Sequence, residues 1–262
     1  MDNSKFNIFE AVRDAYLFVG REWPYLLKAG LLPVIVQIGL SLFIQFQRED
    51  ASQIEGYLWS LPATMLFAWF TFLEMRLLLL GERLDRLPQD HACLLDRQHA
   101  MKLSVITALL FNMGVSSVIT ILMAAASSGQ WGASLPLTLG GLFLIGALFW
   151  GVRFGVVPIL VAVHYPILPA LQQTRGMMFS LRLIGMGMLC LFPLAIVLQI
   201  LLAVFMDRSA DLASQLKLTP VEQMAIIILN APLSLPITVL LNAAAAYALK
   251  QILGRRSDGV LA

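Results

Sequence analysis

Three charged residues fall inside long apolar stretches: Glu74 and Arg76 in one stretch, and Arg153 in a later one. A charge deep in a bilayer costs from about 2.5 to more than 10 kcal/mol, so such side chains usually face protein or water. Glu74 and Arg76 are two positions apart and point to different faces of a helix, so they are not expected to pair. We predict instead a contact between Glu74 and Arg153. This contact would be a step in a translocation route. The alternative is that it only locks the two helices together, while the Arg76 side chain extends to the inner headgroups.

A second set of polar side chains consists of amides at predicted membrane depth. Such groups hydrogen-bond across helices, and each bond contributes about 0.6–2 kcal/mol. We predict interhelical hydrogen bonds for Asn112, Gln199, Asn230 and Asn242.

Metal-ligand residue types gather in one polar segment, where Cys93, Asp96 and His99 would share one face of a helix. Their spacing is not a standard zinc pattern, and all three types are common in solvated loops, so no metal and no cofactor is predicted. His164 precedes Tyr165, and it is expected to mark the headgroup boundary rather than to carry a proton. The chain has no Ser–His–Asp set, no H-E-x-x-H motif and no phosphate-binding glycine loop. Nothing therefore favours an enzyme.

The elements that must position these residues are membrane helices. Charged residues make up only 13% of the 262-residue chain and apolar residues 59%, whereas soluble domains carry roughly a quarter charged residues. A bilayer core about 30 Å thick needs about 20 apolar residues per spanning helix. We therefore predict an all-α, polytopic helix bundle in one membrane domain over residues 1–262. Its six spans are predicted at Pro24–Phe46, Tyr57–Leu80, Leu103–Ala126, Leu135–Val163, Leu181–Phe205 and Val221–Leu249.

The orientation follows from the basic residues. With these spans, 15 of the 18 Lys and Arg residues lie on the side of the two termini. Because cytoplasmic loops carry the excess of Lys and Arg, both termini are predicted to be cytoplasmic. The N-terminal segment is too polar for a signal peptide, so the first span is expected to be uncleaved. The net charge of +2 restates this bias and gives no indication of nucleic acid as a partner.

The spans pair into three hairpins, and each hairpin follows a polar segment with some amphipathic helical character. The clearest of these segments is residues 1–23, where Ile8, Val12, Ala15 and Val19 repeat with helical spacing. That pattern is typical of a helix in the membrane interface. Pro88–Lys102 and Tyr165–Ser180 are weaker cases. The near-equal spacing of the three membrane entries is explained either by a true repeat or by the short outer loops alone.

Two segments resemble a bacterial membrane-protein family. Val152-Arg153-Phe-Gly-Val-Val-Pro158 and Ala170-Leu171-Gln-Gln-Thr174-Arg-Gly176 are similar to a pattern of an arginine before a proline and then a short amphipathic segment. The pattern is shared by free-standing inner-membrane proteins of the YciC type and by the membrane domain of some glycerophosphodiester phosphodiesterases. Gly176 comes early relative to that pattern. The resemblance implies a six-helix protein of the bacterial inner membrane without a phosphodiesterase domain, and it carries over no catalytic residue.

The sequence therefore favours a non-enzymatic inner-membrane protein with a role in envelope or lipid-related membrane homeostasis. Its predicted partners are membrane lipids, above all anionic inner-leaflet headgroups, because basic residues near the surface attract them by about 1 kcal/mol each. A second copy or another membrane protein is a further predicted partner. Two alternatives stay open: a small transporter or permease subunit with a polar site around Glu74 and Arg153, and an anchor or assembly partner of another protein.

Overall fold

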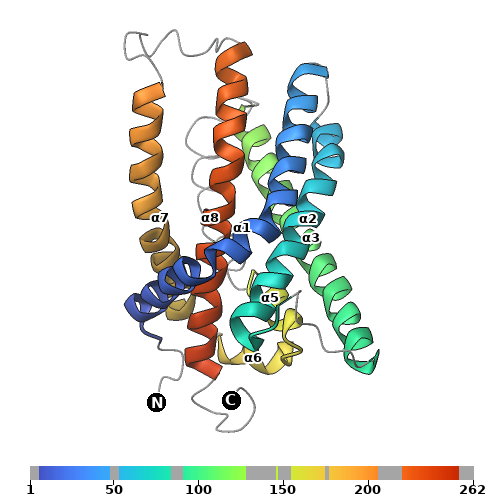
Figure 1. Cartoon of the computed structure of the whole chain (residues 1–262), viewed down its shortest axis with the longest axis vertical. Helices are drawn as coiled ribbons and strands as arrows, with labels where there is room; N and C mark the ends of the chain where they lie inside the picture. Colours follow the sequence, from blue (N-terminus) through green and yellow to red (C-terminus); the bar gives the residue numbers. More distant parts are fainter. Residues whose placement is uncertain are drawn as a thin grey trace.

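The architecture is helical throughout the part of the chain that the structure, a computed structural model, describes (Figure 1). That part comprises residues 6–47, 53–83, 91–127, 146, 155–174, 177–205 and 220–253, and no strand occurs within it. The all-α class is confirmed for these residues. The helices are α1 (Ile8–Gln47), α2 (Gln53–Leu80), α3 (His91–Ser127), α5 (Val157–Ala162), α6 (Ile167–Gln173), α7 (Met177–Phe205) and α8 (Pro220–Leu253).

Four helical segments in the described residues are long and apolar enough to cross a membrane, so the chain is a membrane protein. They overlap the first, second, fifth and sixth predicted spans. The third predicted span, Leu103–Ala126, lies inside α3, whereas most of the fourth, Leu135–Val163, lies outside the described residues. The four segments are Ile8–Ile44, Trp59–Leu80, Met177–Ile196 and Ala231–Ile252.

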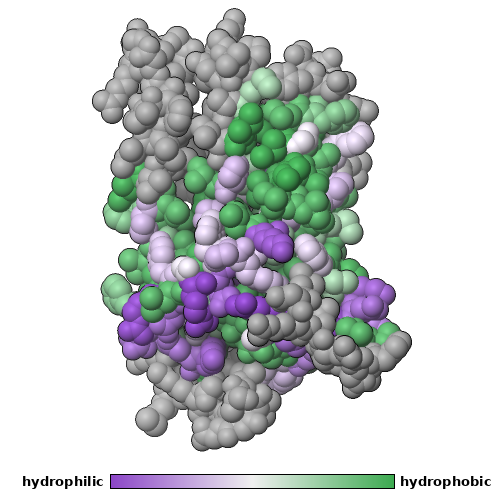
Figure 2. Space-filling model, viewed as in Figure 1, coloured by the Kyte–Doolittle hydropathy of each residue, from purple (hydrophilic) through white to green (hydrophobic). Residues whose placement is uncertain are grey.

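Helix α1 joins the predicted interfacial segment and the first span into one helix with two internal prolines, Pro24 and Pro33. A proline inside a helix removes a backbone hydrogen bond and bends the axis. Figure 1 shows the bend: the N-terminal part of α1 runs across the other helices, and the rest of the helix runs along them. Ala11, Ala15 and Phe18 of the crossing part are buried. Hydrophilic residues gather over this part in Figure 2.

The other two predicted interfacial segments differ from each other. Residues of Pro88–Lys102 from His91 onward belong to α3, which continues without a break toward the third predicted span. In Tyr165–Ser180 the structure has the short helix α6 and, from Met177, the first residues of α7.

The core forms where α1 and α2 pack on α8, and α7 packs on both α8 and α1. Small residues permit close helix approach, and Ala243, Ala244 and Ala246 of α8 are fully buried. Gly30 of α1 lies directly against the side chain of Leu235 on α8, with no room for a Cβ atom. Gly30 therefore allows the close approach of α1 to α8 at Leu235.

Two helix ends adopt left-handed backbone conformations. Gly81 has a φ of +69° after the last residue of α2, and its N–H donates to the Leu77 carbonyl at 3.0 Å. His164 has a φ of 56° after α5; its N–H donates to the Val161 carbonyl at 3.2 Å, and the Tyr165 N–H donates to the Leu160 carbonyl at 2.9 Å. This pair of hydrogen bonds is a Schellman cap, in which glycine is the usual left-handed residue.

Candidate functional site

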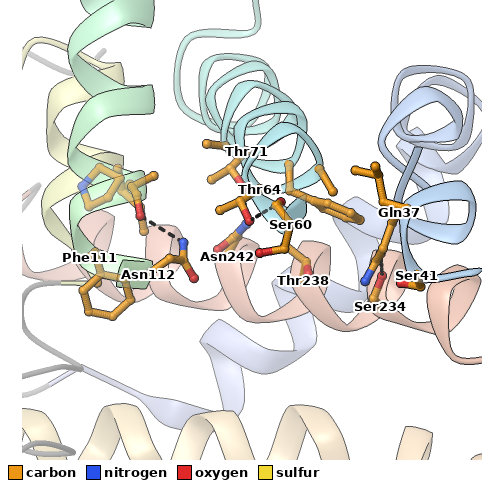
Figure 3. Close-up of a pocket in the computed structure, with 18 of the residues that line it drawn as sticks. Gln37, Ser41, Ser60, Thr64, Thr71, Phe111, Asn112, Ser234, Thr238 and Asn242 are labelled. Carbon is orange, nitrogen blue, oxygen red and sulfur yellow. Dashed lines mark hydrogen bonds between the residues drawn. The ribbon is translucent and has the colours of Figure 1, made fainter. Parts of the chain in front are cut away.

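A polar cavity of about 470 Å³ lies between α1, α2, α3, α5 and α8. Three of these helices, α1, α2 and α8, contain candidate membrane spans, and the cavity residues of all three lie within those spans. No charged side chain occurs among the described residues that line it. Its hydroxyl and amide side chains are Gln37, Ser41, Ser60, Thr64, Thr71, Asn112, Ser234, Thr238 and Asn242 (Figure 3).

Helical spacing explains why these polar groups converge. Ser234, Thr238 and Asn242 follow each other at intervals of four residues on α8, so they form one stripe along the helix. Ser60 and Thr64 on α2 have the same interval, as do Gln37 and Ser41 on α1. Each helix thus turns a narrow polar stripe toward the cavity and leaves its other faces to apolar packing.

The polar stripes are connected across the helices. The hydroxyl of Ser234 on α8 is 3.1 Å from Gln37 Oε1 on α1, and it lies 2.6 Å from the Ala231 carbonyl of its own helix. Asn242 Nδ2 donates to Thr71 Oγ1 of α2 at 3.2 Å. These bonds, drawn in Figure 3, tie α8 to α1 at one point of the wall and to α2 at another.

Other lining groups bond within their own helix. Thr64 Oγ1 donates to the Ser60 carbonyl at 3.0 Å, and Asn112 Nδ2 donates to the Ala108 carbonyl at 2.9 Å. A threonine hydroxyl that donates to its helix still has acceptor capacity, and an amide that donates keeps its carbonyl oxygen. The wall therefore offers hydrogen-bonding groups without a formal charge.

Glu74 lies behind this wall. Its side chain is 0% exposed, and Asn242 Nδ2 donates to its Oε2 at 3.1 Å. Its other oxygen, Oε1, has no hydrogen-bond partner among the described residues. The predicted partner Arg153 lies outside the described residues, so the Glu74–Arg153 contact stays a prediction. The structure instead brings two residues from separate predictions together, Glu74 and the amide of Asn242.

Arg76 is held at the end of α2. Its side chain is 6% exposed, and Nε and Nη2 each donate to one oxygen of Glu82 at 2.7 Å. Nη1 donates to the Ala162 carbonyl of α5 at 3.0 Å, and the guanidinium carbon lies 5.6 Å from the centre of the Phe72 ring. Arg76 is therefore paired within the protein, and the expectation that it reaches the headgroups stays a prediction.

Glu82 is the partner that the sequence reasoning missed. Hydrogen bonding from Arg76 is the main reason why the pKa of Glu82 is lowered; partial burial opposes this shift. The left-handed Gly81 turns the chain back over the last turn of α2, where the Glu82 N–H also donates to the Arg76 carbonyl at 3.2 Å. A glycine directly before an acidic residue, just after an apolar stretch, is the signal that indicated this turn.

The predicted amides have different positions. Asn242 bridges α8 and α2, whereas Asn112 lines the cavity and bonds to its own helix. The side chains of Gln199 and Asn230 lie outside the described set. Of the four predicted interhelical amides, the structure therefore gives a bond between helices to Asn242.

The segment with metal-ligand types contributes to a second pocket, of about 640 Å³, between α3 and the α5–α6 turn. Asp96 Oδ2 lies 3.1 Å from His164 Nε2, and His99 lines the same pocket. The side chain of Cys93 lies outside the described set. No group of three or more metal-ligating side chains occurs among the described residues. What the structure brings together is the Asp96–His164 pair, which links α3 to the α5 cap.

Charged groups cluster where α1 and the end of α2 meet. Glu22 is 8% exposed and accepts hydrogen bonds from Arg21 at 3.1 Å and from Arg83 at 2.5 Å. At the start of α1, the Phe6 carbonyl accepts from Arg182 of α7 at 3.1 Å, and the Asn7 N–H donates to Gln251 of α8. The start of α1 and the end of α8 therefore lie on the same side of the molecule.

Comparisons of the chain with family models, curated proteins and solved structures find no match.

Proposed function

We propose that this protein is a small transporter that binds an uncharged polar solute in the cavity between α1, α2, α3, α5 and α8 and passes it across the membrane. The observation that carries the proposal is the cavity wall: nine hydroxyl or amide side chains line it, and eight of them lie within candidate spans. Polar groups at membrane depth are costly unless they bond to each other, to water or to a ligand. Secondary transporters place their substrate sites at this depth.

The solute class follows from the wall. Because no charged side chain occurs among the described lining residues, an ion would lose its hydration with no opposite charge to replace it. A neutral molecule that carries hydroxyl or amide groups would exchange hydrogen bonds with water for hydrogen bonds with the wall. The cavity volume of about 470 Å³ fits a small solute, since ligand pockets run from about 300 to 1,000 Å³.

The topology that goes with this function is part of the proposal. We infer six spans in three hairpins, with both termini in the cytoplasm of a bacterium, as the basic residues and the resemblance to YciC-type proteins imply. The contact between the start of α1 and the end of α8 supports this, since an even number of spans brings both ends to one side.

A flux assay tests the proposal. Purified protein is reconstituted in vesicles, and the re-swelling rate after an osmotic step is measured with glycerol and with urea. We expect faster re-swelling than in empty vesicles. The isosteric changes Thr64→Val and Thr238→Val remove cavity hydroxyls and should each slow flux about two- to tenfold, the equivalent of one hydrogen bond. Thr107→Val, which removes a hydroxyl that bonds within α3 outside the cavity wall, is the matched control.

The same vesicles distinguish the alternative of lipid-related homeostasis. That alternative is favoured by one feature of α1, whose crossing part exposes Phe9 and Leu17 beside Arg13 and Arg21, as an interfacial helix would. If neither glycerol nor urea enters faster than in empty vesicles, while anionic lipid raises the unfolding temperature, transport is wrong and the lipid role is favoured.

A further inference from the structure

Glu74 is the one carboxyl behind the cavity wall in the described part of the chain, and its surroundings are almost entirely apolar. Phe70, Phe72, Leu73 and Met75 beside it on α2 are all buried. Asn242 of α8 is the only side chain among the described residues that bonds to its carboxyl group. An ionised carboxylate in such surroundings is costly unless a cation or several hydrogen bonds offset the lost hydration.

The described charges nearby are already engaged or do not contact Glu74. Helices α1, α3, α5 and α8 pack against α2, and no ionisable side chain in their described residues contacts the Glu74 carboxyl. Arg76, the next charge along α2, is bonded to Glu82 and to the Ala162 carbonyl. A proton is therefore the simplest neutralising group for Glu74.

Asn242 connects this carboxyl to the cavity. The amide nitrogen carries two hydrogens, and its two acceptors are Thr71 Oγ1 at 3.2 Å and Glu74 Oε2 at 3.1 Å. With both hydrogens used, the Oδ1 acceptor is what Asn242 has left for an occupant of the cavity that it lines. This arrangement suits an ionised Glu74, which can only accept.

A protonated Glu74 reverses the requirement, because its O–H group needs an acceptor. If the amide turns by half a turn, Asn242 Oδ1 accepts from Glu74, and the Thr71 hydroxyl changes from acceptor to donor, as hydroxyls can. The NH₂ group of Asn242 then faces the cavity. Amide nitrogen and oxygen are nearly equal in size, so the turn needs little change in packing.

We propose that Glu74 is a proton-binding site and that its proton turns the Asn242 amide, which replaces an acceptor in the cavity wall by a donor. The proton binds one carboxylate oxygen and comes from water that reaches the cavity; no other covalent bond forms or breaks. The inference rests on the proposed transport function for its purpose, the coupling of solute binding to protonation, but the protonation itself is measured without any solute.

Infrared difference spectroscopy of the purified full-length protein tests the protonation. A change of pH should make the carbonyl stretching band of a buried carboxylic acid appear or vanish. Glu74→Gln, which keeps the shape of the side chain, should abolish this band. Glu10→Gln, a change of an exposed glutamate of α1, should leave it intact. In Asn242→Leu the titration midpoint should move upward by about one pH unit, or tenfold in proton concentration. The ionised form loses a charge-assisted hydrogen bond, which is stronger than the neutral bond that the protonated form loses.

Two outcomes overturn the proposal. If Glu74 gives no carboxylic acid band at any pH at which the protein stays folded, it is permanently ionised. If the carboxylic acid band of Glu74 then appears in Arg153→Gln, the predicted Glu74–Arg153 ion pair is what keeps Glu74 ionised in the wild type. If the band titrates with the same midpoint in Asn242→Leu, Glu74 is not coupled to the cavity wall. If Glu74→Gln and Asn242→Leu both fold poorly, Glu74→Asp keeps a carboxyl at this position, and its band should titrate with a shifted midpoint.

The flux assay separates this inference from the proposed function. Absence of glycerol and urea flux at every pH contradicts transport but leaves the infrared result standing. Flux that depends on pH in the wild type and equally in Glu74→Gln contradicts the switch but leaves transport standing. Flux that loses its pH dependence only in Glu74→Gln supports both.

Discussion

Glu82→Gln is predicted to destabilise the protein by about 2 kcal/mol, because it leaves a buried cation without its carboxylate. The Arg76 side chain is 6% exposed, and two of its three hydrogen-bonding nitrogens donate to Glu82, each at 2.7 Å. Breaking a buried ion pair by removing one partner costs about 3–5 kcal/mol. Glu82 is itself 26% exposed, so water replaces part of what is lost, and the Ala162 carbonyl remains as a partner. Both facts reduce the expected cost.

The opposite change should cost less. In Arg76→Met the buried charge disappears, and the Glu82 carboxylate, which is already partly exposed, is free to hydrate. Replacement of a buried ion pair by apolar side chains of similar volume is often neutral, so we expect about 1 kcal/mol or less. The double variant should cost less than the sum of the single variants, with a coupling energy of about 1–2 kcal/mol.

Acid should lower the free energy of unfolding of the wild type through the same Arg76–Glu82 contact. The pKa of Glu82 is lowered in the folded state, chiefly by the hydrogen bonds from Arg76. The stabilisation is therefore fully present above the carboxyl's ordinary pKa of about 4.3. It is lost as the pH falls through the lower folded value. Glu82→Gln and Arg76→Met should both lack this part of the acid sensitivity.

The measurement is unfolding in mixed detergent micelles, followed by circular dichroism at neutral and at acid pH. Two results would refute the reasoning. The first is that Arg76→Met proves more destabilising than Glu82→Gln, and the second is that the two effects simply add in the double variant.

Two further predictions concern the backbone. Gly30→Ala should lower the free energy of unfolding by about 1–3 kcal/mol, because the new methyl group meets the buried Leu235 side chain. Gly39→Ala, on the same helix with open space at its Cβ position, should be neutral or stabilising by up to about 1 kcal/mol. If Gly30→Ala and Gly39→Ala lower the free energy of unfolding equally in the same assay, the close approach of α1 and α8 is contradicted. At His164, whose φ is 56°, both His164→Gly and His164→Ala lose the contact with Asp96, so their difference reports the backbone alone. The glycine variant should be the more stable by about 1 kcal/mol, and an alanine variant of equal or higher thermal stability would exclude strain at this cap.

The apolar stretches predicted the helices well, because segments long enough to span a bilayer have few alternatives to a helix in lipid. The prediction was weaker where polar segments join them. Residues before Pro24 were expected to form a separate interfacial helix, yet α1 continues through this proline, and the helix is bent as a whole (Figure 1). A proline in a helix changes the axis direction without ending the hydrogen-bonded ladder on both sides, and the spacing of apolar residues does not distinguish a bend from a break.

The candidate site could be predicted only in part. Glu74 and Asn242 stood out separately as polar groups at membrane depth, but they are 168 positions apart, and no local pattern connects them. The hydroxyls of the cavity form a pattern of their own in the sequence. Ser234, Thr238 and Asn242 stand four residues apart in an otherwise apolar stretch, which indicates a polar stripe facing something other than lipid.

The chemistry of the wall gives a reason why an asparagine separates Glu74 from the cavity. A charged residue at position 242 would hold its own hydration water and repel or trap ions at the binding site. A serine or threonine hydroxyl can donate as well as accept, so it would adapt to either state of Glu74 by rotation of one hydrogen. The same oxygen atom would then line the cavity in both states. An amide cannot do so, because its donors and its acceptor lie on different atoms. The amide must turn as a whole, and each turn exchanges the acceptor and the donor that face the cavity. Thr71, which shares the amide nitrogen of Asn242 with Glu74, has the adaptable hydroxyl that both orientations need. Asparagine at position 242 with threonine at position 71 is thus an arrangement in which one proton, bound outside the cavity, changes the hydrogen-bonding character of a neutral site without placing a charge in it.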